Sequence, residues 1–558
     1  MNTAVYRRLV LTTLMAAFIA WAIPATAENP TVQPTAPLLI DRARLDRQPQ
    51  LPTARTATPS AQKDALKNAP DIKPFTLRGV LVQGAPSLEP AALHAAYADR
   101  IGSEITIKDI GAISDKIGAL YKDAGFPLYS VVVPKQDFGD GTLTVRVTEG
   151  YVDNVIIDGD TEDADLDLIR AYAAKIVADQ PLHHWVLARY LLLMNDIPGL
   201  KVGSRFDPAQ SSAGVTLRLT IERKHFDFAL NFDNEGSKFI SRLQFTATAT
   251  ANSIFQQGDR TEFIYGFPAN FNDYHYYGVT HLEPIGTEGT TVQFSTSYLE
   301  TRPLNSSIDG DAYTAGFTFT VPIIRQQEES LSLIGSLDAL NSSNGFLGQT
   351  FSNERTRAIR VGAAYVTGLL DGTEVTSVSG VLSQGIDALG ARPGGFGTGG
   401  PTFTKVNIKI EHDRVLIENV IARLKAGGQY ALDAVPASEE FTYGGPDFGR
   451  AFGDAEVTGD RGIEAGAEIA YQVPSAWIGL SFLTNPEVYG FYDIGKLWLL
   501  NPALRSPDLG QSAGVGARIR VYDKLTLQIE AGFPVECPSQ VGSSCSTGRG
   551  VFSLGSKF

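Results

Sequence analysis

The chain has 558 residues, and 47 Lys and Arg against 61 Asp and Glu give a formal net charge of −14. This acidity argues against a nucleic-acid-binding protein, because phosphate backbones are bound by basic surfaces. Charged residues make up 19% of the chain, while 55 Gly, 29 Phe and 20 Tyr are typical of a protein with many strands and turns. The two cysteines, Cys537 and Cys545, exclude a disulfide framework or a thiolate zinc site and leave at most one loop disulfide.

Residues 1–27 predict a secretory signal peptide. Arg7 and Arg8 precede an apolar run over 9–23, and Ala27 ends a small-residue cleavage pattern. No later stretch is long and apolar enough for a transmembrane helix. An exported chain of this kind is either soluble outside the cytoplasm or a β-barrel of an outer membrane.

Residues 28–73 contain repeated Pro and predict an extended linker. Within this linker, the Pro-free stretch 38–47 carries three Arg and can form a short basic helix. From its composition alone this stretch is a fluctuating helix in a disordered tail.

Two copies of one module follow the linker. Residues 75–150 alternate as strand, helix, helix, strand, strand, and residues 151–223 repeat the same order. The sequence therefore predicts two α+β modules in tandem.

Residues 224–558 lose the helical pattern and alternate with period two between turn clusters. Val292 and Phe294, for example, lie on the face opposite Gln293 and Ser295. A soluble sandwich can alternate in the same way, but the long Gly- and Ser-rich intervals and aromatic strand ends favour a membrane barrel. At roughly 20 residues per strand and connection, this segment accommodates about 16 strands. The fold class is therefore mainly β.

Several motifs carry a family resemblance. Residues 121–128 (YKDAGFPL) and 141–150 (GTLTVRVTEG) of the first module, with 193–200 (LMNDIPGL) of the second, resemble polypeptide-transport-associated (POTRA) repeats. Together with the signal, linker and barrel, they resemble the transporter half of bacterial two-partner secretion, the TpsB (ShlB/FhaC/HecB haemolysin secretion and activation) family. The resemblance covers nearly all of the chain after the signal peptide.

Two barrel segments are similar to further family motifs. Residues 448–452 resemble the tip of a long sixth extracellular loop that folds back into the lumen, although Gly449 and Ala451 replace the usual Val and Gly. Residues 491–493 resemble a Phe-x-Asp motif on a later barrel strand. The resemblance implies a pair between the loop and the barrel wall, Arg450 with Asp493, and the motif neighbours Phe448, Gly449, Phe452 and Phe491.

The spacing of residues supports this pair independently. In a strand over 488–494, period two places Tyr489, Phe491 and Asp493 on one face, which must be the lumen because lipid penalises a carboxylate. A guanidinium can bind such a carboxylate bidentately and hold a loop inside the pore. Without the resemblance, Arg450 is equally well a solvated loop charge.

The resemblance implies a translocase in the bacterial outer membrane, with its modules in the periplasm. Its partners are a secreted exoprotein similar to a haemolysin or adhesin, the barrel-assembly machinery during biogenesis, and outer-membrane lipid. The resemblance further implies that 38–47 is a plug helix, and that Phe558 ends the signal for barrel assembly. Cys537 and Cys545 are a candidate disulfide in the last extracellular loop. We expect no nucleic acid, cofactor, metal or catalytic residue.

Three other classes of function can be compared with these features. A barrel-assembly protein or insertase of the same superfamily usually carries more than two modules, and a passive porin leaves 75–223 unexplained. Ser512 lies in a Gly-x-Ser-x-Gly motif, but it lacks the strand-to-helix turn and the later His that a hydrolase needs. His183 and His184 are adjacent and match no metal-ligand spacing.

Overall fold

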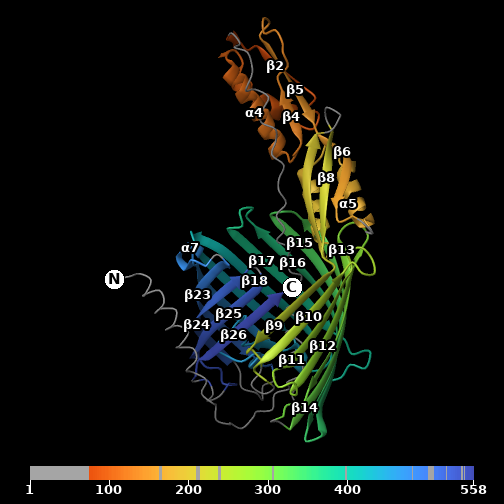
Figure 1. Ribbon diagram of the computed structural model, residues 1–558, viewed down its shortest axis with the longest axis vertical. Helices are drawn as coiled ribbons and strands as arrows, with labels where there is room; N and C mark the ends of the chain where they lie inside the picture. Colours follow the sequence, from red (N-terminus) through yellow and green to blue (C-terminus); the bar gives the residue numbers. More distant parts are fainter. Residues whose placement is uncertain are drawn as a thin grey trace, which may run out of the picture. The chain divides into compact units, whose positions relative to one another are not determined.

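The computed structural model describes residues 74–558 except 162–165, 209–213, 237–240, 305–306, 396–398, 481, 501–507, 523, 542–544 and 546 (Figure 1). The expected signal peptide (1–27) and the linker (28–73) with its basic stretch 38–47 lie outside the described residues. None of the helices in the described part is both long enough and apolar enough to cross a membrane.

The first module is a three-stranded sheet covered by a long helix. Helix α4 begins with a capping box in which Asp109 accepts hydrogen bonds from the Thr106 backbone and hydroxyl, which lower the pKa of Asp109. Ile113 and Ile117 of α4 are buried against the sheet. The elements are β1 (Phe75–Thr76), β2 (Gly79–Gln83), α3 (Pro90–Ala95), η1 (Ala98–Arg100), β3 (Glu104–Ile105), α4 (Ile107–Asp123), β4 (Tyr129–Val132) and β5 (Thr142–Glu149).

The strand order of the first sheet is β2-β5-β4, with β2 parallel to β5 and β4 antiparallel to it. The short pair β1 and β3 is an addition to the expected strand, helix, helix, strand, strand order. Strands β2 and β4 form the two edges of this sheet.

The second module repeats this design. Its sheet has the order β6-β8-β7, again with a parallel first pair, and two helices pack on it through Ile169, Ile176 and Leu191. Its elements are β6 (Tyr151–Gly159), α5 (Asp167–Ala178), α6 (His184–Asn195), β7 (Leu200–Pro208) and β8 (Gly214–Arg223).

The remaining chain forms a closed antiparallel barrel in which β26 pairs with β9 (Figure 1). Closure removes the free strand edges that a bilayer does not tolerate. The sixteen strands match the expected number. They are β9 (Phe226–Asp233), β10 (Gln244–Asn252), β11 (Arg260–Pro268), β12 (Tyr274–Ile285), β13 (Thr290–Thr301), β14 (Ile308–Arg325), β15 (Glu329–Phe346), β16 (Gln349–Gly368), β17 (Glu374–Gly385), β18 (Thr404–Ile417), β19 (Val420–Ala431), β22 (Arg461–Gln472), β23 (Leu483–Trp498), β24 (Asp508–Val521), β25 (Leu525–Glu536) and β26 (Arg549–Lys557).

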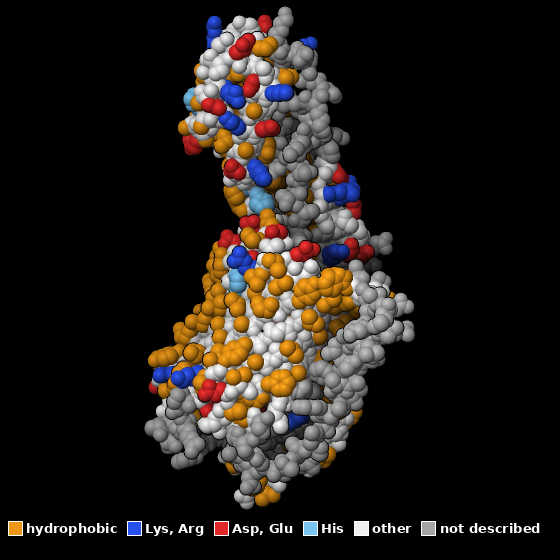
Figure 2. Space-filling view, turned by 90° about the vertical axis from the view of Figure 1, so that its left-hand side faces the viewer, with side chains coloured by type: hydrophobic (Ala, Val, Ile, Leu, Met, Phe, Trp, Pro, Cys, Tyr) orange, Lys and Arg blue, Asp and Glu red, His pale blue; other side chains and the backbone are white. Residues whose placement is uncertain are grey.

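The outer face of the barrel is apolar. Large side chains such as Phe294, Phe317 and Ile408 are about half exposed, and Figure 2 shows hydrophobic side chains spread over the barrel wall in view. Charged side chains such as Glu468 and Asp493 are buried inside. The alternation thus places apolar side chains on the outer face, toward lipid, and polar side chains inside the barrel, as a membrane barrel requires.

One strand offers a matched test of this orientation. Phe317 of β14 points outward, whereas its neighbour Thr318 points inward. In phospholipid vesicles, Phe317→Arg should lower the unfolding free energy by about 2–4 kcal/mol, the cost of a cation on the lipid face near the bilayer centre. Thr318→Arg should cost much less, and equal urea midpoints for the two variants would contradict the assigned faces.

Candidate functional site

A long loop occupies the barrel interior. We call residues 432–460, between β19 and β22, loop 6, because it is the sixth connection at the long-loop end of the barrel. The opposite end, where residues 418–419 connect β18 to β19, is the short-turn end. Loop 6 contains η2 (Ala437–Glu439) and a small hairpin of β20 (Phe441–Tyr443) and β21 (Val457–Gly459).

Arg450, at the tip of loop 6, is buried against the barrel wall. Its Nε and Nη2 each lie 3.0 Å from a different carboxylate oxygen of Asp493, and its backbone N–H donates to the same carboxylate at 3.2 Å. Ser512 of β24 donates a further hydrogen bond to Asp493. Asp493 is fully buried, so its charge depends on Arg450 for compensation.

Other wall carboxylates share the guanidinium. Nη1 of Arg450 lies 2.9 Å from Glu468 of β22 and 3.6 Å from Glu530 of β25. Glu468 also accepts from Arg518 at 2.6 Å and from Arg423 at 2.8 Å. We call Arg450, Asp493, Glu468, Glu530, Arg423, Arg518 and Glu487 the tip cluster; in it, Glu487 pairs with both Arg423 and Arg518.

Aromatic rings complete the tip contacts. The Arg450 guanidinium lies 3.6 Å from the centre of the Phe491 ring, and Arg518 lies 3.9 Å from that of Tyr489. Phe448 and Phe452 are buried in one cluster with Tyr443. The loop tip is therefore held by charge, ring stacking and apolar packing together.

Small residues in the wall make room for these side chains. A Cβ at Gly514 would lie 2.4 Å from the Phe491 ring, and one at Gly495 would lie 2.3 Å from the ring of Tyr443. A Cβ at Gly532 of β25 would lie 3.0 Å from the backbone of Arg450. The wall of strands β22–β25 is thus shaped to receive loop 6.

Gly449, one of the two departures from the family motif, has a structural reason. Its φ is +67°, and a Cβ there would lie 2.8 Å from the Tyr443 ring. A β-branched Val is strained in this conformation. The tip of loop 6 therefore has a local backbone that requires glycine.

An open cavity lies beside the tip cluster. It measures about 550 Å³, is lined by Arg450, Glu468 and Asp493, and reaches Val375 and Arg520 near the short-turn ends of β17 and β24. Charged side chains make up about half of its lining, so the cavity presents a polar surface near this end of the barrel.

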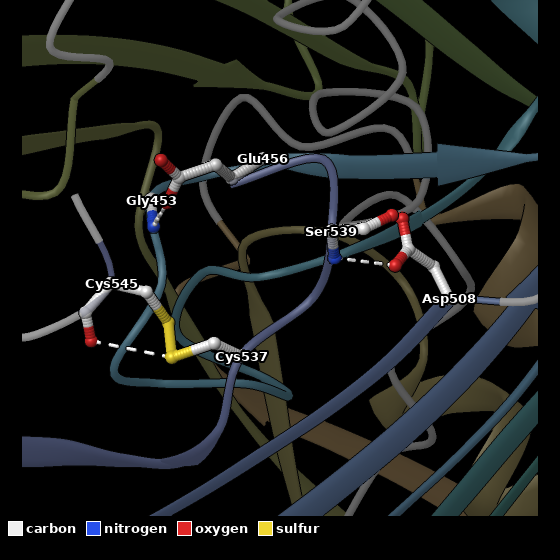
Figure 3. The surroundings of a disulfide bond; sticks show 6 residues. All are labelled: Gly453, Glu456, Asp508, Cys537, Ser539 and Cys545. Carbon is white, nitrogen blue, oxygen red and sulfur yellow. Dashed lines mark hydrogen bonds between the residues drawn. A yellow bond between two sulfur atoms is a disulfide. The ribbon is translucent and has the colours of Figure 1, made fainter. Parts of the chain in front are cut away.

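Cys537 and Cys545 form a disulfide in the loop between β25 and β26 (Figure 3). Asp508 of β24 accepts hydrogen bonds from the backbone of Ser539 and Gln540 in the same loop. Cys545 packs in the apolar cluster that contains Tyr443 of loop 6. The disulfide loop therefore covers part of loop 6.

The other residues singled out from the sequence form no separate site in the described part of the chain. Phe558 is exposed, and its backbone N–H donates to Phe228 of β9 at 2.9 Å. Ser512 lies within β24, not at a strand-to-helix turn. His183 contacts Asp179 at 2.9 Å, and none of the His, Cys, Asp and Glu in the described part of the chain forms a group that could hold a metal ion.

Of the tip cluster, sequence reasoning predicted only the pair of Arg450 and Asp493. Period two along β22 is compatible with Glu468 in the lumen, but the residue that Glu468 meets there depends on strand register and on the path of loop 6. An Arg on the lumen face of each of two strands, Arg423 and Arg518, was the available signal for additional ion pairs.

Comparisons with known proteins now decide the family. Residues 215–520, more than half of the chain, match the haemolysin secretion/activation protein ShlB/FhaC/HecB family, and residues 75–150 match the ShlB-type POTRA domain. The chain belongs to the ShlB/FhaC/HecB family. These are the transporters of two-partner secretion, so this protein is an outer-membrane transporter for a secreted partner exoprotein.

Individual relatives are distant. The chain is 20% identical to the heme/hemopexin transporter protein HuxB of Haemophilus influenzae strain Rd, over 78% of this chain and 79% of HuxB. The match to HuxB of strain 86-028NP spans 65% of that protein. The chain is 21% identical to the outer membrane transporter CdiB of Dickeya dadantii, over 83% and 84% of the two chains.

Solved structures share the fold. CdiB from Escherichia coli matches with a TM-score of 0.71 and 18% identity, over 93% of this chain and 96% of that chain. BamA from Haemophilus ducreyi lacking POTRA domains 1–3 matches with a TM-score of 0.53 and 14% identity, over 87% of this chain and 100% of that chain.

The backbone at Gly449 leads to a prediction. Gly449→Val places a β-branched residue at a positive φ and against Tyr443, at a cost of about 1–3 kcal/mol to tip docking. In planar bilayers the open probability of the channel should rise about tenfold, which corresponds to 1.4 kcal/mol. Gly453→Ala is the control, because its new Cβ meets the flexible Glu456 carboxylate. Equal open probabilities for the two variants would reject this account of the tip.

Proposed function

We propose that this transporter exports its partner exoprotein as an unfolded chain through the barrel lumen. The observation that supports the proposal is the burial of Arg450 of loop 6 inside the barrel, with Asp493 as a bidentate partner. A loop held in this way obstructs the lumen. Export then requires the tip to leave Asp493, and the pair sets how readily this happens.

The proposed orientation follows from the two ends of the barrel. In barrels of this class short turns face the periplasm and longer loops face outside, so the POTRA modules lie in the periplasm and the disulfide loop outside. The apolar outer face contacts outer-membrane lipid. The final strand, ending at Phe558, is the segment that we propose the barrel-assembly machinery recognises.

The modules are suited to bind an extended polypeptide. Among the described residues, the edge strands of these sheets pair on one side only; they are β2 and β4 in the first module and β6 and β7 in the second. Leu81 of β2 and Val132 of β4 are large apolar side chains with 50% and 40% exposure. A passing chain can add a strand to such an edge and place its own apolar residues against it.

We propose an exoprotein similar to a haemolysin or adhesin as the cargo. The family description refers to haemolysin secretion and activation, and HuxB, a distant relative, is described as a heme/hemopexin transporter. Folding of the cargo outside the cell provides a driving force that needs no nucleotide.

Other functions have less support. The fold shared with BamA is compatible with barrel assembly, but proteins of that class usually carry more than two modules and the described residues contain two. A passive porin does not account for the modules. Ser512, the residue of the hydrolase-like motif, donates a hydrogen bond to Asp493 inside the barrel, which gives it a structural role in place of a catalytic one.

Substitution at the loop and wall pair tests the export proposal. Arg450→Ala and Asp493→Ala should each impair secretion of the partner while the barrel still inserts, because a tip without its partner has no defined position to which it returns between export events. Removing one partner of a buried pair leaves the other charge uncompensated, at a cost of up to about 3–5 kcal/mol that lumen water reduces. Secretion into the medium is measured with heat-modifiable mobility as the assay of barrel insertion.

The double variant should be less impaired than the sum of the two single defects, because both remove the same interaction. Arg450→Lys is the matched control: it keeps the charge but loses the bidentate geometry, so its defect should be intermediate. Additive defects, or two silent single variants, would show that the pair does not act in secretion.

Removal of the modules tests their part in the proposal. A chain lacking 75–223 in frame should insert its barrel but secrete no partner, since the strand-accepting edges are gone. Charged residues in place of Leu81 and Val132 should reduce secretion in the intact chain. Unchanged secretion by the deletion variant would exclude the modules as the cargo-binding part.

A further inference from the structure

A second ion cluster holds the start of loop 6 on the barrel wall. The carboxylate of Glu439, in η2, is 2% exposed. One oxygen lies 2.6 Å from Nη2 of Arg360 on β16, and the other lies 2.8 Å from Nζ of Lys405 on β18. Two cations from two strands therefore bind this one loop carboxylate.

The strands behind Glu439 support these cations. Arg360 also pairs with Asp338 of β15 at 2.9 Å and donates to Ser383 of β17 at 2.7 Å. Its orientation is therefore fixed independently of the loop. The side chains of β15–β18 are thus already oriented to bind a carboxylate at the position of Glu439.

The backbone of the loop is held at the same place. The Glu439 carbonyl accepts hydrogen bonds from Lys405 Nζ at 2.7 Å and from Gln429 Nε2 at 2.8 Å, and Gln429 also donates to the Asp460 carbonyl at 3.1 Å. The preceding residue, Ser438, donates to the buried Glu354 of β16. We call Glu439, Arg360, Lys405, Asp338, Gln429, Ser438 and Glu354 the root cluster.

The two clusters share no residue, and β19, which carries Gln429 of the root cluster and Arg423 of the tip cluster, is the one strand that contributes to both. The root cluster uses β15, β16, β18 and β19, whereas Asp493, Glu468 and Glu530 of the tip cluster lie on β22, β23 and β25. Gly444 and Gly445 lie between Glu439 and Arg450 and have φ values of +112° and +115°. Two consecutive glycines can absorb large dihedral changes, as hinge segments do.

We propose that Glu439 is a positioning residue that keeps the root of loop 6 on the barrel wall during secretion. Only the segment 444–456 then swings away from Asp493, with Gly444 and Gly445 as the hinge. The inference rests on the proposed function, and it states which part of the loop moves. A tethered loop returns to the lumen after each export event without having to be threaded in again.

Two engineered disulfides distinguish movement of the tip from movement of the whole loop. The hydroxyl oxygens of Ser438 and Thr356 lie 3.3 Å apart, so Ser438→Cys with Thr356→Cys can bridge the root to β16. A Cβ at Gly532 would lie 3.1 Å from Cα of Ala451, so Ala451→Cys with Gly532→Cys can bridge the tip to β25. Both pairs are placed in a chain with Cys537→Ser and Cys545→Ser.

The oxidised root disulfide should leave secretion within about twofold of the reduced form of the same variant, because the root stays in place in either case. The oxidised tip disulfide should lower secretion at least about tenfold, and reduction should restore it. Comparing oxidised and reduced forms of each variant separates the effect of the bridge from that of the substitutions. Equal loss from both disulfides would overturn the inference, because the whole loop would then have to leave.

Neutralising the carboxylate tests Glu439 itself. With the tip bound, Glu439→Gln should leave channel conductance near that of the unmodified protein. In an Arg450→Ala background it should increase the size and frequency of openings, because neither end of the loop is then held. Glu439→Asp should restore the smaller openings. Asp447→Asn, which alters a loop carboxylate with 56% side-chain exposure, is the control.

The results separate the two proposals. If the tip disulfide does not lower secretion, export does not require tip movement and the proposed export path fails. If Glu439→Gln leaves the channel of the Arg450→Ala protein unchanged, Glu439 is not the anchor, whatever the tip does. Heat-modifiable mobility verifies barrel insertion for every variant.

Discussion

The structure of the lumen depends on the compensation of charges inside a closed barrel. A carboxylate such as Asp493 cannot face lipid, and once loop 6 covers it, water no longer surrounds it. Arg450 supplies the missing positive charge, and the planar fork of its guanidinium fixes the loop tip in one orientation. The ring of Phe491, the glycines of the wall and the backbone of Gly449 are all arranged around this one side chain.

The two main carboxylates of the tip cluster, Glu468 and Asp493, depend on Arg450 to different degrees. Glu468 keeps Arg423 and Arg518 as partners if Arg450 leaves, whereas Asp493 keeps the hydroxyl of Ser512. The cost of releasing the loop is therefore concentrated on one carboxylate, while the wall arginines and Glu468 form a stable background. Such an arrangement gives the loop one defined closed position. The energy barrier to its release is then mainly the loss of one ion pair, which binding of the cargo can offset.

Much of the fold is predictable because its signals are local. Alternation of apolar and polar residues with period two identifies the barrel strands and the face of Asp493, and helical spacing identifies the modules. Loop contacts are different. Which wall residues meet Arg450 depends on the register of β22 with β23, and Glu439 meets Arg360 only because the loop turns back along the wall, a path that no residue pattern encodes. The left-handed backbone of Gly449 is likewise a property of the folded loop, so its replacement of the usual Val had no evident reason in the sequence.

The wall glycines have a consequence for how this sequence can vary. In a water-filled barrel, lumen positions tolerate many side chains because nothing packs against them. Here a methyl group at Gly514 would overlap the Phe491 ring at 2.4 Å, and one at Gly532 would be in tight contact with the backbone of Arg450 at 3.0 Å. Neutral drift is therefore restricted on the inner face of these strands, and a change there has to be matched by a change in loop 6. The interior of this barrel evolves under the constraints of a protein core.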